Sequence, residues 1–161
     1  MDQTGKRWWV EKEYYWDPAK THRQKTNGEF ADDVQAFIAD YALKAIYIDP
    51  SAASFKLELQ KRGIHCIDAN NDVAYGIQQT SSELYKGNLV IMDTCVNLIK
   101  EIEGYVWDSK KVEKGEDEPM KGSGIMDHAC DALRYAIATH KVPKTFDSDG
   151  KTLGGGFRRV G

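Results

Sequence analysis

The chain has 161 residues, 41% of them hydrophobic, and a formal net charge of −3, which suits one soluble domain with its own hydrophobic core. The negative charge argues against binding of nucleic acid by bulk charge alone, because phosphate contacts usually need a basic face. No apolar run approaches the ~20 residues of a membrane span, and no signal-peptide segment opens the chain, so we expect a cytosolic protein without a membrane partner. Three scattered cysteines without a CxxC pair indicate neither a disulfide framework nor a zinc site.

The segment RWWVEKEYYW, residues 7–16, has the alternation of a β-strand. Trp8, Val10, Tyr14 and Trp16 fall on one face of it. Such aromatic density serves either core packing or the stacking of nucleic-acid bases. The position of this strand at the start of the chain allows it to be antiparallel to the others.

The rest of the chain alternates helices and strands. A capping box of Thr26 and Glu29 predicts a helix start, and the apolar run 45–49 predicts a strand buried on both faces. Pro50 suits the first turn of a helix that continues through residues 54–62. Further strands are expected at 65–69 and 89–92, and further helices after Asp72, after Asp93 or Thr94, and over 126–140. This order predicts an α/β domain with parallel neighbouring strands.

Acidic side chains stand at two of these element ends. Asp49 ends the strand 45–49, where it either caps the next helix or holds a metal ion. Asp127 and Asp131 are four residues apart, so they share one face of the last helix and repel each other unless a cation is near. Arg134 is one candidate for that cation, and a divalent metal beside Asp127 is the other. Carboxylates at a strand end and at a helix start are a common way to build a site for hard cations.

Four motifs occur in order along the chain: YIDPSAASFKLELQKRGI, ANNDVAYGI, EIEGYVWD and DHACDALRYA. Together they resemble the nuclease domain of the large terminase subunit of tailed bacteriophages, over about residues 2–139. The resemblance implies a ribonuclease-H-like fold, a mixed sheet flanked by helices. It also implies cleavage of concatemeric double-stranded viral DNA with two Mg²⁺ or Mn²⁺ ions during genome packaging. The setting would be the cytoplasm of a bacterial host, with the portal and the small terminase subunit as partners.

The resemblance also assigns residues. Asp49 and Asp127 match two of the family's three metal carboxylates, and Asp131 is a weaker third candidate. We expect the first two to lie within roughly 4–8 Å of each other, as ligands of shared or neighbouring ions do. The basic residues Lys110, Lys111, Lys114 and Lys121 lie in a charged segment, 107–124, that we expect to be a mobile loop able to contact DNA phosphates. His128 borders the site and either orients a ligand or is an ordinary surface or core histidine.

The match departs from the family pattern at its beginning. The chain starts near the turn before the third family strand, so we expect the first two strands and the first metal carboxylate to be absent. On this view residues 1–142 are a partial nuclease domain, residues 143–161 are a flexible glycine-rich tail, and the truncated sheet edge favours self-association. The alternative is a catalytically inactive remnant, for example of a prophage, that binds DNA or a packaging partner.

Overall fold

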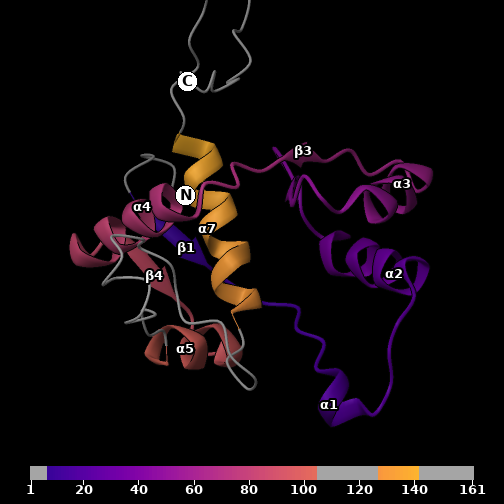
Figure 1. Ribbon diagram of the computed structural model, residues 1–161, viewed down its shortest axis with the longest axis horizontal. Helices are drawn as coiled ribbons and strands as arrows, with labels where there is room; N and C mark the ends of the chain where they lie inside the picture. The colour runs from indigo at the N-terminus through magenta and orange to yellow at the C-terminus, as the bar shows by residue number, and fades with distance from the viewer. Residues whose placement is uncertain (1–6, 105–126, 142–161) are drawn as a thin grey trace, which may run out of the picture.

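The computed structural model describes residues 7–104 and 127–141 (Figure 1). The expected loop 107–124 and the expected tail 143–161 lie outside these ranges. The strands are β1 Trp8–Val10, β2 Tyr47–Ile48, β3 Ile67–Asp68 and β4 Leu89–Ile91. The helices are α1 Pro18–Thr21, α2 Asn27–Ile38, α3 Ala53–Lys61, α4 Val73–Tyr85, α5 Val96–Glu103 and α7 His128–Lys141.

The strands form two parallel pairs. β1 pairs with β4, with Trp8 opposite Leu89, and β2 pairs with β3, with Tyr47 opposite Ile67. The expectation that the first strand could be antiparallel is therefore wrong for the pairing that the described residues show. β1 is also shorter than the predicted 7–16, because its partner β4 ends at Ile91 and leaves residues 11–16 without a strand beside them.

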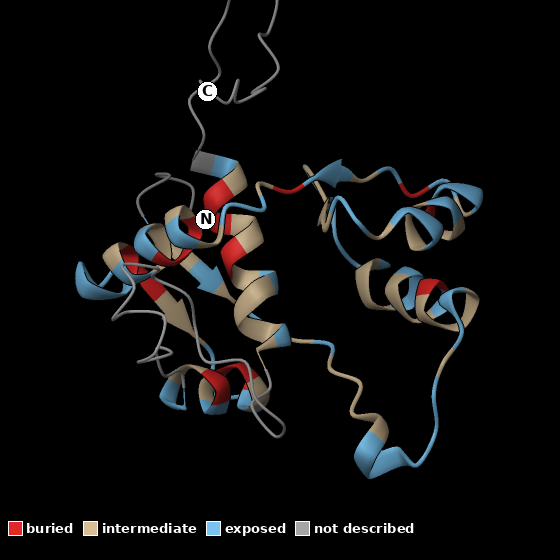
Figure 2. Cartoon of the chain, viewed as in Figure 1, coloured by how far each residue is buried: buried red, intermediate tan, exposed pale blue. Residues whose placement is uncertain are grey.

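The elements gather in two groups on either side of α7 (Figure 1). β2, β3, α2 and α3 form one group, whose core consists of the buried Ala31, Leu59 and Ile64 with partly buried neighbours around them. β1, β4, α4 and α5 form the other, and the buried stretches of α4, α5 and α7 face one another there (Figure 2). β2 is only half-buried, so the prediction of a strand buried on both faces is wrong; in the described residues it pairs on one side only.

Helix α7 joins the two groups. It packs against α4 and α5 on one side and contacts β2 on the other. Near its C-terminal end, the ring of His140 meets Trp8 of β1 edge to face with centroids 5.3 Å apart, and its Nδ1 lies 3.4 Å from the hydroxyl of Tyr47 in β2. One histidine of α7 thus touches a strand of each pair.

Local sequence signals explain where several helices begin and end. Thr26 and Glu29 form the predicted capping box of α2, and Asp72 caps α4 by accepting the backbone N–H of Tyr75. Gly63 follows α3 with φ of 74°, a conformation that glycine adopts without strain. Helix α3 itself begins at Ala53 and not at Pro50, and Ala52, at its N-cap position, makes no side-chain capping bond.

Candidate metal centre

Asp49 follows β2 directly and is held by three donors. Its Oδ1 accepts the backbone N–H of Ser51 at 2.8 Å and the hydroxyl of Ser51 at 2.7 Å, and its Oδ2 accepts the hydroxyl of Tyr135 at 2.7 Å. The bond from the Ser51 hydroxyl, then the bond from Tyr135 and then the backbone N–H of Ser51 lower the pKa of Asp49 below its ordinary value. Because these bonds close a turn at Ser51 and do not cap α3, the helix-cap explanation of Asp49 is wrong.

Tyr135 of α7 ties the helix to this end of β2. Its hydroxyl lies 2.7 Å from Asp49 Oδ2 and 3.3 Å from Asn71 Oδ1. A phenol has one proton to donate, and the shorter contact goes to the carboxylate. Burial first, and then the bond to Asp49, raise the pKa of Tyr135 to about 12, so Tyr135 remains a donor at neutral pH. The bond fixes the position of α7 along its helix axis relative to Asp49.

Asp127 occupies the N-cap position of α7, since its carbonyl accepts the first helical N–H, that of Asp131, at 2.8 Å. The carboxylate of an N-cap aspartate usually accepts the N–H groups two and three residues on. Here both of these, from Ala129 and Cys130, donate instead to Glu101 Oε2, at 2.8 and 3.0 Å. The Asp127 side chain is 25% exposed, and its one recorded polar contact among the described residues is His128 Nδ1 at 4.0 Å.

Asp131 lies one turn further along α7 and is paired with Arg134. Its Oδ1 accepts from Nη2 at 3.0 Å and from Nε at 3.2 Å, so the arginine is the cation that neutralises this carboxylate. The Arg134 side chain is only 5% exposed. It crosses α4 at Gly76, where a Cβ atom would lie 2.3 Å from Arg134 Cγ, so this crossing needs glycine at position 76.

These residues suit a divalent ion in kind but not in number. Carboxylate oxygens are the donors that Mg²⁺ and Mn²⁺ prefer, and Asp49 and Asp127 each stand where their carboxylate caps no helix. Within residues 7–104 and 127–141, however, no three Asp, Glu, His or Cys side chains gather closely enough to hold a metal ion. The described part of the chain therefore supplies separate candidate ligands and not a complete metal site.

Comparison with known proteins decides the family. The sequence profile described as a terminase RNAseH-like domain matches residues 1–139. The chain belongs to the terminase RNAseH-like domain family. It is 28% identical over 115 residues to the terminase large subunit of Escherichia phage T5. It is 40% identical to the large terminase of a thermophilic bacteriophage, with TM-scores of 0.76 and 0.77 in two crystal forms of that protein.

The terminase domain described above matches only part of these relatives. The T5 alignment covers 71% of this chain and 26% of the T5 protein. The alignments with the large terminase of the thermophilic phage cover 84% of this chain and 33% or 34% of that protein's chain. The ribonuclease-H-like fold class expected from the sequence motifs is confirmed. No helix in the described ranges is both long and apolar enough to cross a membrane.

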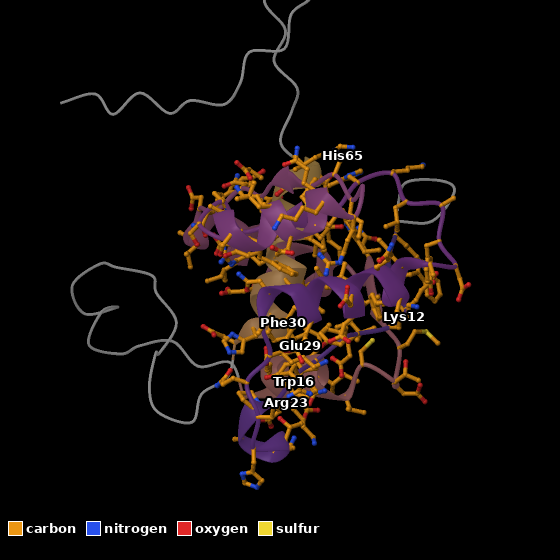
Figure 3. The ribbon with its side chains drawn as sticks, turned by 90° about the vertical axis from the view of Figure 1, so that its right-hand side faces the viewer. Lys12, Trp16, Arg23, Glu29, Phe30 and His65 are labelled. Atoms are coloured by element: carbon orange, nitrogen blue, oxygen red, sulfur yellow. The ribbon has the colours of Figure 1, made fainter. Side chains whose placement is uncertain are left out.

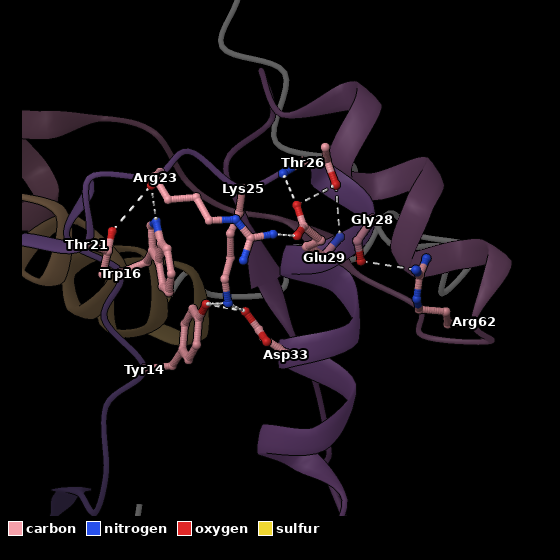
Figure 4. Close-up of polar contacts among 10 residues, drawn as sticks. All are labelled: Tyr14, Trp16, Thr21, Arg23, Lys25, Thr26, Gly28, Glu29, Asp33 and Arg62. Carbon is pink, nitrogen blue, oxygen red and sulfur yellow. Dashed lines mark hydrogen bonds and ion pairs between the residues drawn. The ribbon is translucent and has the colours of Figure 1, made fainter. Parts of the chain in front are cut away.

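The basic cluster 20–25 of the terminase domain serves its own structure. Arg23 pairs with Glu29, and Lys25 pairs with Asp33 while lying 4.0 Å above the ring of Trp16 (Figure 4). Seen from the side, Trp16 and Arg23 sit close to Glu29 at the start of α2 (Figure 3). Most of the charge in this cluster is thus balanced within the fold. The basic residues expected to contact DNA, Lys110, Lys111, Lys114 and Lys121, lie outside the described residues.

The aromatic side chains of residues 7–16 also pack within the terminase domain. Trp8 meets His140, the ring of Tyr14 lies edge to face with Phe37 at 6.2 Å, and Trp16 Nε1 donates to the carbonyl of Arg23 at 3.1 Å. Trp8, Tyr14 and Trp16 therefore have partners within the fold, although none of them is fully buried and Trp9 is exposed.

Two residues of the site escaped the sequence reasoning. Tyr135 follows Asp131 by four residues, so it shares a face of α7 with Asp127 and Asp131. This spacing could have identified Tyr135 as a residue of the site. Glu101 carried no such signal, because it acts on α7 from another helix. His128 is 71% exposed, which favours the surface explanation for this histidine.

Proposed function

We propose that this chain is nuclease-domain sequence of a phage terminase large subunit and serves metal-dependent cleavage of double-stranded DNA during genome packaging. The observation that carries the proposal is that the carboxylates of Asp49 and Asp127 are not used to cap a helix. Both stand at element ends where a carboxylate usually caps a helix, yet neither does so. Membership of the terminase family supports the same assignment. The bond from Tyr135 to Asp49 joins α7 to the end of β2, the two places where these aspartates stand.

In this proposal Asp49 and Asp127 hold Mg²⁺ or Mn²⁺, with Asp131 as the weaker candidate because its charge is already neutralised by the guanidinium of Arg134. When bound, a pair of such ions activates water and stabilises the leaving oxygen of a phosphodiester. The chain's own part is to orient the ligands: Ser51 and Tyr135 fix both oxygens of Asp49. Since the described residues gather no three-ligand group, the isolated chain should cut DNA slowly at best.

Calorimetric titration of the purified chain with Mn²⁺ tests the proposal, with relaxation of supercoiled plasmid as a second measurement. Asp49→Ala and Asp127→Ala should each weaken Mn²⁺ binding by roughly 10-fold or more, by analogy with the cost of disturbing metal-site residues. They should also abolish any Mn²⁺-dependent nicking. The matched control is Asp40→Ala, which alters an exposed aspartate after α2. Mn²⁺ binding that neither aspartate affects would contradict the assignment.

The second candidate is a non-catalytic module that binds DNA or a packaging partner. The lack of a three-ligand group among the described residues favours it. Electrophoretic mobility shift in EDTA separates the two candidates: tight binding of duplex DNA without metal, together with no Mn²⁺ binding at Asp49 or Asp127, would support the module.

A further inference from the structure

The N-terminal end of helix α7 is capped by a side chain from another helix, α5. The N–H groups of Ala129 and Cys130 both donate to Oε2 of Glu101, which lies on α5, 28 and 29 residues earlier in the chain. The other oxygen, Oε1, accepts the hydroxyl of Tyr15 at 2.8 Å. Glu101 is 8% exposed. A buried carboxylate is costly unless it is hydrogen-bonded, and these three donors, together with the positive end of α7, supply what it needs.

Because Glu101 caps α7, the carboxylate of Asp127 is not needed as a cap. An N-cap aspartate that accepts two backbone N–H groups turns its carboxylate back onto its own helix. In this chain Glu101 has taken both donors, so the Asp127 carboxylate is not bound to its helix. It remains partly exposed at the start of α7.

We propose that Glu101 is a positioning residue for the candidate metal centre: by capping α7 from α5 it keeps the Asp127 carboxylate available to a divalent cation. This proposal rests on the proposed function. Glu101 does not touch the ion; it acts through Asp127. Tyr15 orients Glu101 by holding Oε1, which leaves Oε2 directed at α7.

The first experiment needs no metal and tests the exchange of caps. Thermal unfolding is followed in EDTA for Glu101→Leu, which removes the acceptor but keeps a side chain of comparable length, for Asp127→Ala, and for the double variant. Loss of a helix cap costs about 0.5–2 kcal/mol, and each kcal/mol shifts the Tm of a chain this size by ~2–4 °C. In Glu101→Leu, Asp127 can rotate and accept the freed N–H groups. The double variant should therefore lose more Tm than the two single losses added together.

Two variants keep this test informative if Glu101→Leu folds poorly. Glu101→Gln retains an acceptor oxygen for the N–H groups of Ala129 and Cys130, so it should stay near the Tm of the unaltered chain. Tyr15→Phe frees Oε1 and should give a smaller loss that again grows in the Asp127→Ala background. The control is Glu103→Leu, an exposed position on the same helix. Additive Tm losses in both pairs of variants would overturn the proposal.

The second experiment measures Mn²⁺ affinity by calorimetry. Substitutions that disturb the groups orienting metal ligands typically cost 10–100-fold in affinity, and Glu101→Leu should fall in this range while Glu101→Gln stays close to the unaltered chain. In the Asp127→Ala background, Glu101→Leu should cause no further loss. Affinity that depends on Asp127 but not on Glu101 would overturn this inference alone. Affinity that does not depend on Asp127 would overturn the proposed function and this inference together.

Discussion

Replacing Gly76 with alanine should destabilise the chain, although alanine is normally favoured inside a helix by about 0.5–1 kcal/mol. Gly76 lies within α4 under the side chain of Arg134. The new Cβ would stand 2.3 Å from Arg134 Cγ and 2.7 Å from Cδ. Cγ is close to the α7 backbone, so the arginine has to leave its rotamer and with it the two bonds to Asp131.

The size of the effect follows from two opposing terms. Overpacking of this kind costs about 1–3 kcal/mol, and the gain in helix propensity offsets part of it. A net loss of ~1–2 kcal/mol remains, which corresponds to a fall in Tm of roughly 2–8 °C for a chain of this length. Without the arginine side chain the clash disappears, so the same substitution should be neutral or stabilising in the Arg134→Ala background.

Thermal unfolding followed by circular dichroism measures all four members of this cycle. Gly28→Ala is the matched control, because a Cβ on Gly28 of α2 would come no closer than 3.8 Å to a neighbouring atom. A higher Tm for Gly76→Ala in the unaltered background would refute the reasoning. An equal fall with and without Arg134 would refute it as well.

Two further predictions concern pH and association. Because the pKa of Asp49 lies below its ordinary 3.8 in the folded chain, its carboxylate stabilises the fold above that pH, and this contribution is lost as pH falls through the lowered pKa. Ser51→Ala, and to a smaller extent Tyr135→Phe, should therefore flatten the acid limb of a plot of unfolding free energy against pH; an unchanged limb would contradict the bonding described. The chain should also self-associate at micromolar concentration, since Trp9 of β1 and Ile67 of β3 are exposed on short strands. Light scattering should show more than the 18.2 kDa of one chain and should return to that mass in Ile67→Lys, whereas a monomeric parent chain would speak against edge pairing.

Signals within a few residues of each other predicted their structure correctly. The capping box of Thr26 and Glu29, the helix start after Asp72 and the helix end near residue 62 each depend on neighbours in sequence, and all three are present. The order of strands and helices followed from the same kind of local pattern. Strand lengths did not, because a strand extends only as far as its partner, and the partner of β1 lies 81 residues further along the chain.

The helix caps near the candidate site could not be predicted from neighbouring residues either. The sequence offered Asp93 or Thr94 as the cap of α5, but Glu13 supplies it by accepting the N–H groups of Asn97 and Leu98 at 2.8 and 2.9 Å. Helix α7 likewise takes its acceptor from Glu101. Spacing rules compare a helix only with its own flanking residues, so they cannot detect an acceptor brought in by the tertiary fold. For the same reason they could not tell that Asp127 is released from capping.

The position of His140 has a consequence for how the chain folds during synthesis. Its ring contacts Trp8 of β1 and its Nδ1 approaches Tyr47 of β2. His140 therefore joins β1, near the start of the described residues, to the end of α7. A ribosome adds about 5–20 residues per second, and α7 leaves it after the four strands of the described residues. Until then β1–β4 and β2–β3 lack the helix that lies between them. The exposed surfaces of both pairs are therefore open to other chains for several seconds, until α7 is available to pack between them.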